Sequence, residues 1–246
     1  MVRQPSLRER AIAEAVGTFL LVFLGCGAVA SVGVFAHLNH RAITMADLLL
    51  IAFAFGLALF IIVMIVGKVS GAHVNPAVTI ALASIGRFPT EEIPAYVVGQ
   101  LIGALIGAAC IPIVFGSFAA KYGSLGAPSL ATNTNLLQGL IAEGLGTAIL
   151  VITIVATAVD SRAPAGWAGL SIGLSLAVII MFIGPATGSS VNPTRAIGPD
   201  IVNLFFGVTT DWGAYIVCYL IGPLLGGVGG AWLYAYFSRM PTRKAA

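Results

Sequence analysis

Two segments of this chain repeat each other, and each interrupts an apolar stretch: VSGAHVNPAV at 69–78 and ATGSSVNPTR at 186–195. Proline removes a backbone donor and breaks a helix, and lipid cannot satisfy the peptide groups that such a break exposes. Each segment must therefore be covered by protein or line water. The alignment pairs Gly71 with Gly188, Asn75 with Asn192 and Pro76 with Pro193.

Two further stretches repeat in the same order along the chain. YVVGQLIGALIGA at 96–108 matches YIVCYLIGPLLGG at 215–227, and AEAVGTF at 13–19 matches AEGLGTA at 142–148. The matches predict one domain, residues 1–246, made of two repeats at about 1–120 and about 130–240. The residues between the repeats, 116–135, are rich in Gly, Ser, Ala and Asn, and we expect them to form a long connecting loop.

Composition indicates an integral membrane protein. The chain is 59% hydrophobic and 9% charged, with a mean hydropathy of +1.02, whereas roughly 25% of residues are charged in ordinary soluble domains. Six apolar segments come near the roughly 20 residues that a helix needs to cross a bilayer: 9–31, 47–67, 93–115, 135–159, 166–184 and 212–237. The first has no convincing cleavage pattern, so we expect a retained helix, not a signal peptide.

Each repeat would cross the membrane three times, an odd number, so the second repeat enters from the opposite side and is inverted. With both termini in the cytoplasm, nine Lys and Arg residues lie inside and three outside, as the positive-inside rule requires. The outer three are Arg41, Lys121 and Arg195. The sequence predicts an all-α protein of the cell membrane with six transmembrane helices, two re-entrant half-helices and cytoplasmic termini.

Each Asn-Pro pair also reads as a helix start, because Asn is a favoured N-cap and Pro suits the first helical position. About ten helical residues follow Pro76, roughly half the hydrocarbon thickness. The segment after Pro193 contains Gly198 and Pro199, so we expect that half-helix to be short or kinked. Both half-helices would point their positive amino ends at the membrane midplane, which disfavours cations there.

The residues before each Asn-Pro pair must reach the midplane as extended backbone. Their carbonyls would line a pathway with the amides of Asn75 and Asn192 at its centre. A water molecule that accepts hydrogen bonds from both amides cannot pass a proton along the file. The residues predicted to supply these pore-lining carbonyls are Gly71, Ala72, His73, Gly188, Ser189 and Ser190. His73 has a second interpretation, a pH-responsive gate.

These motifs resemble the major intrinsic proteins, the family of aquaporins and glycerol facilitators, over nearly the whole chain. In that family Ala follows each Asn-Pro pair; Ala77 fits this pattern, whereas Thr194 departs from it. The resemblance implies a selectivity filter of Phe55, Ile180, Ser189 and Arg195, a set similar to that of archaeal-type aquaporins.

The resemblance also implies that Glu14 and Glu143 accept hydrogen bonds from the re-entrant loops, and that the protein is a homotetramer. Two rows of glycine permit close helix contact, within a protomer or between protomers. These rows are Gly99, Gly103 and Gly107, and Gly222, Gly226 and Gly230.

The sequence favours a passive channel for water that also admits small neutral solutes such as glycerol. The alternatives are a glycerol-selective facilitator and a proton-coupled secondary transporter that uses Glu14 and Glu143 as a relay. An enzyme is disfavoured, because no nucleophile, base and orienting group can be assembled. The three cysteines and three histidines lack metal-ligand spacing, so we expect no metal and no cofactor, and the net charge of +3 does not indicate a nucleic-acid partner.

Overall fold

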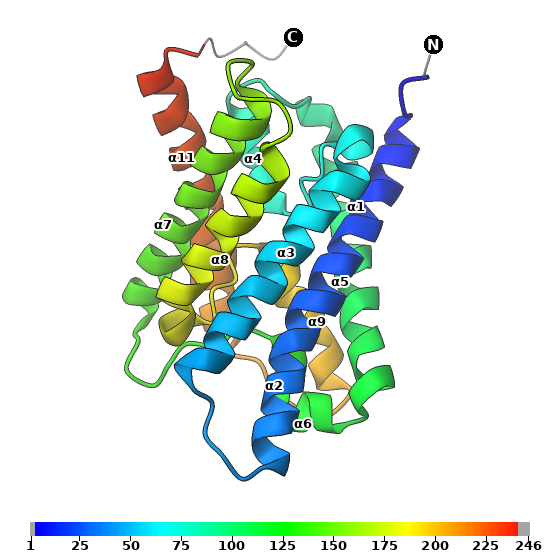
Figure 1. The fold of residues 1–246 in the computed structure, drawn as a ribbon, viewed down its shortest axis with the longest axis vertical. Coiled ribbons are helices and arrows are strands. Elements are labelled where there is room, and N and C mark those ends of the chain that lie inside the picture. Colours follow the sequence, from blue (N-terminus) through cyan, green and yellow to red (C-terminus); the bar gives the residue numbers. More distant parts are fainter. Residues whose placement is uncertain (1–2, 241–246) are drawn as a thin grey trace.

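The computed structural model describes residues 3–240, which form a bundle of long helices (Figure 1). Six helical spans in this range are long and apolar enough to cross a membrane. They are α1, η1 and α2 (Leu7–Leu21, Val22–Cys26 and Gly27–Leu38); α3 (Met45–Ser70); η2 and α5 (Thr90–Glu92 and Ile93–Phe115); α7 and η4 (Leu136–Ile154 and Val155–Val159); α8 (Ala168–Thr187); and α10, η5 and α11 (Trp212–Ala214, Tyr215–Ile221 and Gly222–Ser238).

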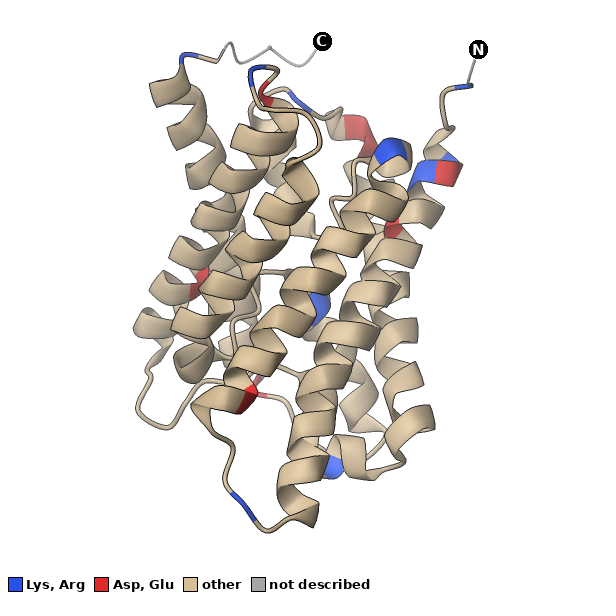
Figure 2. Cartoon of the chain, viewed as in Figure 1, with Lys and Arg blue, Asp and Glu red and all other residues tan. Residues whose placement is uncertain are grey.

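The arrangement of these spans agrees with the predicted crossings. Helix α1 begins and α11 ends at the same end of the bundle (Figure 1), as an even number of crossings requires. Charged residues gather mostly at the two ends of the molecule (Figure 2). The charged side chains buried within the described residues are Glu14, Glu143, Asp160, Arg195 and Asp200.

Two half-helices follow the Asn-Pro pairs: α4, Pro76–Ser84, and α9, Pro193–Leu204. The expectation of a short or kinked second half-helix is wrong in length, because α9 has 12 residues and α4 has 9. Gly198 lies directly against the backbone of Ala104 on α5, so a side chain at this position would push the two helices apart. Close packing thus outweighs the low helix propensity of Gly198 and Pro199.

The segment that joins the repeats is more ordered than a plain loop. It contains a short helix, α6, at Phe118–Gly123 and a 3₁₀ turn, η3, at Ser124–Gly126. Ser124 and Leu125 both have left-handed backbone conformations, with φ of 46° and 48°. After this turn, Ala131 N donates to Ala186 O at the end of α8, and the connection is thereby held against the second repeat.

Both rows of glycine pack within one chain. A β-carbon on Gly99, Gly103 or Gly107 of α5 would meet the backbone of Ala11, Ala15 or Phe19, which lie on α1. In the second repeat, Gly222, Gly226 and Gly230 lie in the same way against the backbone of Leu140, Gly144 and Ala148 on α7. These faces are therefore used inside the protomer, where small residues let two helix backbones approach.

Candidate functional site

The two half-helices begin in the same way and are joined across the repeat axis. Asn75 and Asn192 are the N-caps, each followed by Pro at the first helical position. Asn75 Nδ2 donates to Val191 O, and Asn192 Nδ2 donates to Val74 O, each at 2.8 Å. Since an amide nitrogen carries two hydrogens, each Asn retains one for another acceptor.

The loops that lead to these caps have a matching pattern of unusual backbone angles. Gly71 and Gly188 end α3 and α8 with φ of 89° and 73°. Four non-glycine residues also have positive φ, between 43° and 51°: Ala72 and Val74 in the first loop, Ser189 and Val191 in the second. Left-handed angles are costly for a β-branched residue such as valine. Strong interactions must hold both loops in this form.

In the first repeat Glu14 supplies those interactions. Its side chain is fully buried, and Oε1 accepts from Ser70 Oγ (2.7 Å) and His73 N (3.0 Å). Oε2 accepts from Val74 N (2.6 Å) and Gln100 Nε2 (2.7 Å). Four donors around one carboxylate match its acceptor capacity, so the contacts that the family resemblance implies for Glu14 are present.

Glu143 has the same place in the second repeat. Its Oε1 accepts from Thr187 Oγ1 (2.6 Å) and Ser190 N (2.9 Å), and its Oε2 accepts from Val191 N (2.6 Å). The side chain is fully buried. In both repeats the carboxylate thus accepts hydrogen bonds from two consecutive loop N–H groups, and these bonds stabilise the strained backbone.

A cavity of about 190 Å³ runs past both caps, enough space for several water molecules. It is lined by Asn75 and Asn192, and by five of the six residues predicted to supply carbonyls: Gly71, Ala72, His73, Ser189 and Ser190. Gly188 is outside the lining, and a β-carbon added at this position would meet Pro128. Neither Glu14 nor Glu143 is among the lining residues in the described part of the chain.

Much of the remaining lining of the cavity is apolar. Its side chains come from α1, α3, α7 and α8: Leu21, Leu59, Val63, Leu150, Ile154 and Leu176. A pathway lined by a few polar residues and many hydrocarbon side chains offers hydrogen bonds over only part of its wall. Such a lining suits a file of small neutral molecules.

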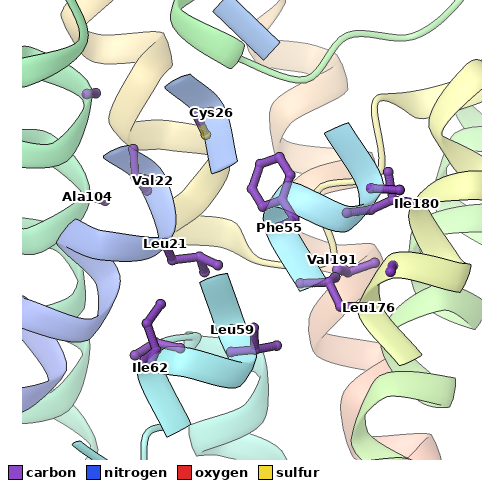
Figure 3. Packing of buried hydrophobic residues seen from close by; sticks show 14 of the residues in the cluster. Leu21, Val22, Cys26, Phe55, Leu59, Ile62, Ala104, Leu176, Ile180 and Val191 are labelled. Carbon is purple, nitrogen blue, oxygen red and sulfur yellow. The ribbon is translucent and has the colours of Figure 1, made fainter. Parts of the chain in front are cut away.

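The four residues of the expected filter come together around this cavity, and each is at most 3% exposed. Phe55 on α3 and Ile180 on α8 belong to the buried apolar cluster (Figure 3). The Arg195 guanidinium lies over the Phe55 ring, 4.8 Å from its centroid, and Nη1 donates to Gly126 O at 3.0 Å. Within residues 3–240, Arg195 Nε and Ser189 Oγ have no hydrogen-bond partner.

Thr194 uses its hydroxyl at the helix junction. Thr194 Oγ1 donates to Asn192 Oδ1 at 2.9 Å, and the same oxygen accepts from Thr194 N and Arg195 N. The substitution therefore adds a third donor to the cap. It leaves Asn192 Nδ2 directed at Val74 O.

His73 packs within its loop. Its Nδ1 lies 3.1 Å from Thr79 Oγ1, and its ring packs against the rings of Phe88 and Tyr96 at centroid distances of 4.9 and 5.1 Å. Tyr96 in turn donates to Ser70 O at 2.7 Å. These contacts favour the packing interpretation of His73 over the gate.

Comparisons with known proteins agree with this architecture. The family model described as "Major intrinsic protein" matches residues 1–234. The chain belongs to this family. It is 42% identical to the probable aquaporin AqpM of Archaeoglobus fulgidus over 95% of this chain and 98% of that protein. It is 36% identical to nodulin-26 of Glycine max over 92% and 76% of the two chains.

A solved structure has the same fold. The X-ray structure of the aquaglyceroporin from Plasmodium falciparum matches with a TM-score of 0.81 and 29% identity, over 93% of this chain and 96% of that one. This major intrinsic protein, with its six crossings and two half-helices, therefore has the same fold as a solved structure.

Several residues that support the site in this major intrinsic protein are not predicted by the sequence patterns. Gln100, Tyr96 and Tyr219 hold the loops from the neighbouring helices, and Gly126 holds Arg195. For Gln100 a signal was present, since a polar residue in an apolar span usually has a specific partner. For Gly126 no sequence pattern indicates that its carbonyl approaches Arg195.

Proposed function

We propose that this chain is a passive membrane channel for water that also admits small neutral solutes such as glycerol, more slowly. One observation carries the proposal: a single cavity contacts both Asn caps, backbone of both re-entrant loops and the four filter residues. Because each Asn retains one free amide hydrogen, a solute oxygen at this point would accept from both. The solute thus exchanges its hydration for fixed donors and acceptors.

The same geometry supports the exclusion of ions and protons. A water molecule that accepts from both amides directs its own hydrogens away from them, and this orientation interrupts a proton-conducting file. The positive ends of α4 and α9 and the charge of Arg195 all disfavour cations in the cavity. Phe55 and Ile180 supply the apolar part of the expected filter, which favours water and small solutes over strongly hydrated ions.

The coupled-transporter alternative has less support. A relay group must face the solute path and exchange its proton, whereas all four oxygens of Glu14 and Glu143 accept hydrogen bonds from loops and neighbouring side chains. Their partners are the residues that hold the re-entrant backbone. We assign both carboxylates to the scaffold.

We also propose a homotetramer in the cell membrane, with cytoplasmic termini and a separate pore in every protomer. The family relationship and the excess of cations on one side support this assignment. Because the two glycine rows are occupied within the protomer, other helix faces must form the contacts between protomers.

Stopped-flow measurement on reconstituted vesicles tests the channel. We expect osmotic water flow well above that of empty liposomes, with slower glycerol uptake and no dependence on a proton gradient. Leu176 lines the cavity and Val178, on the same helix, is 62% exposed. Leu176→Trp should reduce flow towards that of empty liposomes, whereas Val178→Trp should not. Flow equal to that of empty liposomes in the wild type would refute the channel, and saturable uptake driven by protons would favour the transporter.

A further inference from the structure

A groove runs along the outside of the bundle between α1 and α5, which pack side by side (Figure 1). It has a volume of about 530 Å³, and among the described residues it shares no lining with the conducting cavity. Its lining extends from Arg8 to Phe19 on α1 and from Ala95 to Ile106 on α5. Arg8 is the one polar residue in this lining within residues 3–240. The proposed conduction pathway uses neither wall.

The shape of the groove follows from the sizes of its side chains. Gly99 and Gly103 are buried in its floor, where a β-carbon on either would meet the backbone of Ala11 or Ala15. The rims consist of larger side chains, each between 44% and 55% exposed: Ile12, Val16, Val98, Ile102 and Ile106. A floor of small residues between two rows of branched side chains leaves space for a flexible hydrocarbon chain.

The groove covers the depth of one leaflet. Gly17 on α1 lies directly against Val74, the residue before the Asn75 cap, so this level of α1 is the level at which the half-helices meet. Arg8 is nine positions earlier, about 14 Å away at 1.5 Å per residue. Half of the roughly 30 Å hydrocarbon core is about 15 Å. The groove therefore begins near the membrane surface on the side of the termini and ends near the midplane.

Arg8 places a positive charge at the surface end of the groove. It is exposed, and within residues 3–240 it forms no salt bridge. The two nearby arginines are both paired, Arg3 with Glu9 and Arg10 with Glu92. A guanidinium binds phosphate oxygens through paired hydrogen bonds. A free guanidinium above a hydrocarbon groove therefore complements a phospholipid with net negative charge.

The equivalent position in the second repeat carries no charge. Because residues 13–19 match residues 142–148, the counterpart of Arg8 is Leu137 on α7, which is 64% exposed. The second repeat is inverted, so Leu137 belongs to the opposite leaflet. The repeated scaffold thus places a cation at this position in one leaflet only.

We propose that the groove binds an anionic phospholipid of the leaflet on the side of the termini. One acyl chain lies between α1 and α5, and the phosphate group contacts Arg8. The lipid covers the helix contact that Gly99 and Gly103 form. The proposal is independent of which solute the channel conducts.

Native mass spectrometry of the purified full-length protein tests the site, with phosphatidylglycerol and phosphatidylcholine of the same acyl chains as probes. We expect phosphatidylglycerol to bind at lower concentration. Arg8→Gln should weaken phosphatidylglycerol binding about fivefold, which corresponds to the roughly 1 kcal/mol that one Arg contributes near an anionic surface, and should leave phosphatidylcholine binding unchanged. Ala15→Leu, which fills the groove, should weaken binding of both lipids.

Arg239→Gln is the matched control, because Arg239 is an exposed arginine at the end of α11, at the same end of the bundle and outside the groove. Equal binding of the two lipids by the wild type, or equal losses in Arg8→Gln and Arg239→Gln, would overturn the proposal. A changed oligomeric mass in Ala15→Leu with unchanged lipid binding would also overturn it and assign the groove to a second copy of the chain. If Ala15→Leu does not fold, Arg8→Gln against Arg239→Gln decides alone. Water flow measured on the same variants reports separately on the channel.

Discussion

At the first break in the chain, Asn75 Oδ1 accepts one hydrogen bond, from Ala77 N; at the second, Asn192 Oδ1 accepts three. The residue after the first motif is Val78, and its equivalent in the second is Arg195. The backbone of the two breaks is nevertheless the same, with positive φ at matching residues and a buried Glu behind each loop. Duplication therefore provides the scaffold, and we expect the side chains that differ between the repeats to provide selectivity.

The supports behind the two loops differ as well. Gln100 donates to Glu14 in the first repeat, and its counterpart is Tyr219, which donates to Thr187 O instead. The first carboxylate thus accepts four hydrogen bonds and the second three. The first break therefore has more hydrogen bonds to its buried carboxylate, and the second has more hydrogen bonds to the side chain of its Asn cap.

The largest effect should come from the helix contacts that the two repeats share. Gly103→Leu and Gly226→Leu would each place a side chain into the backbone of the neighbouring helix, at Ala15 or Gly144. Transmembrane helices associate through such close packing, so we expect loss of folded, monodisperse protein in both cases. Gly229→Leu on α11 is the control, because no neighbouring helix or loop among residues 3–240 comes within 4 Å of its β-carbon position. Size-exclusion profiles in detergent measure the outcome; a normal profile for Gly226→Leu would contradict the packing of α11 on α7.

Removal of the buried carboxylates should have the next largest effect. Glu14→Ala and Glu143→Ala each leave two loop N–H groups without acceptors, at about 1–3 kcal/mol for each group. Glu14→Ala also leaves Gln100 Nε2 without this acceptor, so we expect the lower thermal midpoint for that variant. Thermal unfolding in detergent compares them, with exposed Glu91→Ala as the control. The reverse order would show that Gln100 finds another acceptor.

The sequence predicted the crossings, the half-helices and the inverted repeat because each depends on local pattern: apolar length, Asn before Pro, and segments that match in order. It failed where distant residues decide the structure. Gly198 and Pro199 have low helix propensity, but α9 is continuous through them, and Gly198 packs against Ala104 on α5. Similarly, the left-handed angles of Val74 and Val191 follow from hydrogen bonds to residues far away in the chain.

The candidate site divides in the same way. Asn75 and Asn192 can be predicted from their motif. Glu14 and Glu143 can be predicted because each is a charged residue in an apolar span. Phe55 and Ile180 have no local signal and were assigned only by the family resemblance.

Arg195→Val would make the second break resemble the first, where Val78 has this position. Loss of the guanidinium removes a positive charge and the group that lies over Phe55. We expect glycerol and urea uptake to rise several-fold relative to water flow, and cation leakage to increase, because the barrier is both steric and electrostatic. Stopped-flow uptake in proteoliposomes measures the ratio. Unchanged selectivity would mean that Arg195 does not contact the solute.

The smallest effect should come from Thr194, the one departure from the family motif. Thr194→Ala removes one of three donors to Asn192 Oδ1, at about 0.5–1.5 kcal/mol, the usual net contribution of a hydrogen bond. The two backbone donors remain, so Asn192 Nδ2 should still reach Val74 O and water flow should change little. Thr194→Ser keeps the hydroxyl and removes the methyl group. If the hydrogen bond is what matters, the thermal midpoint of Thr194→Ser stays near that of the wild type while Thr194→Ala falls. Equal losses in both variants would instead assign the contribution to packing of the methyl group at the helix junction.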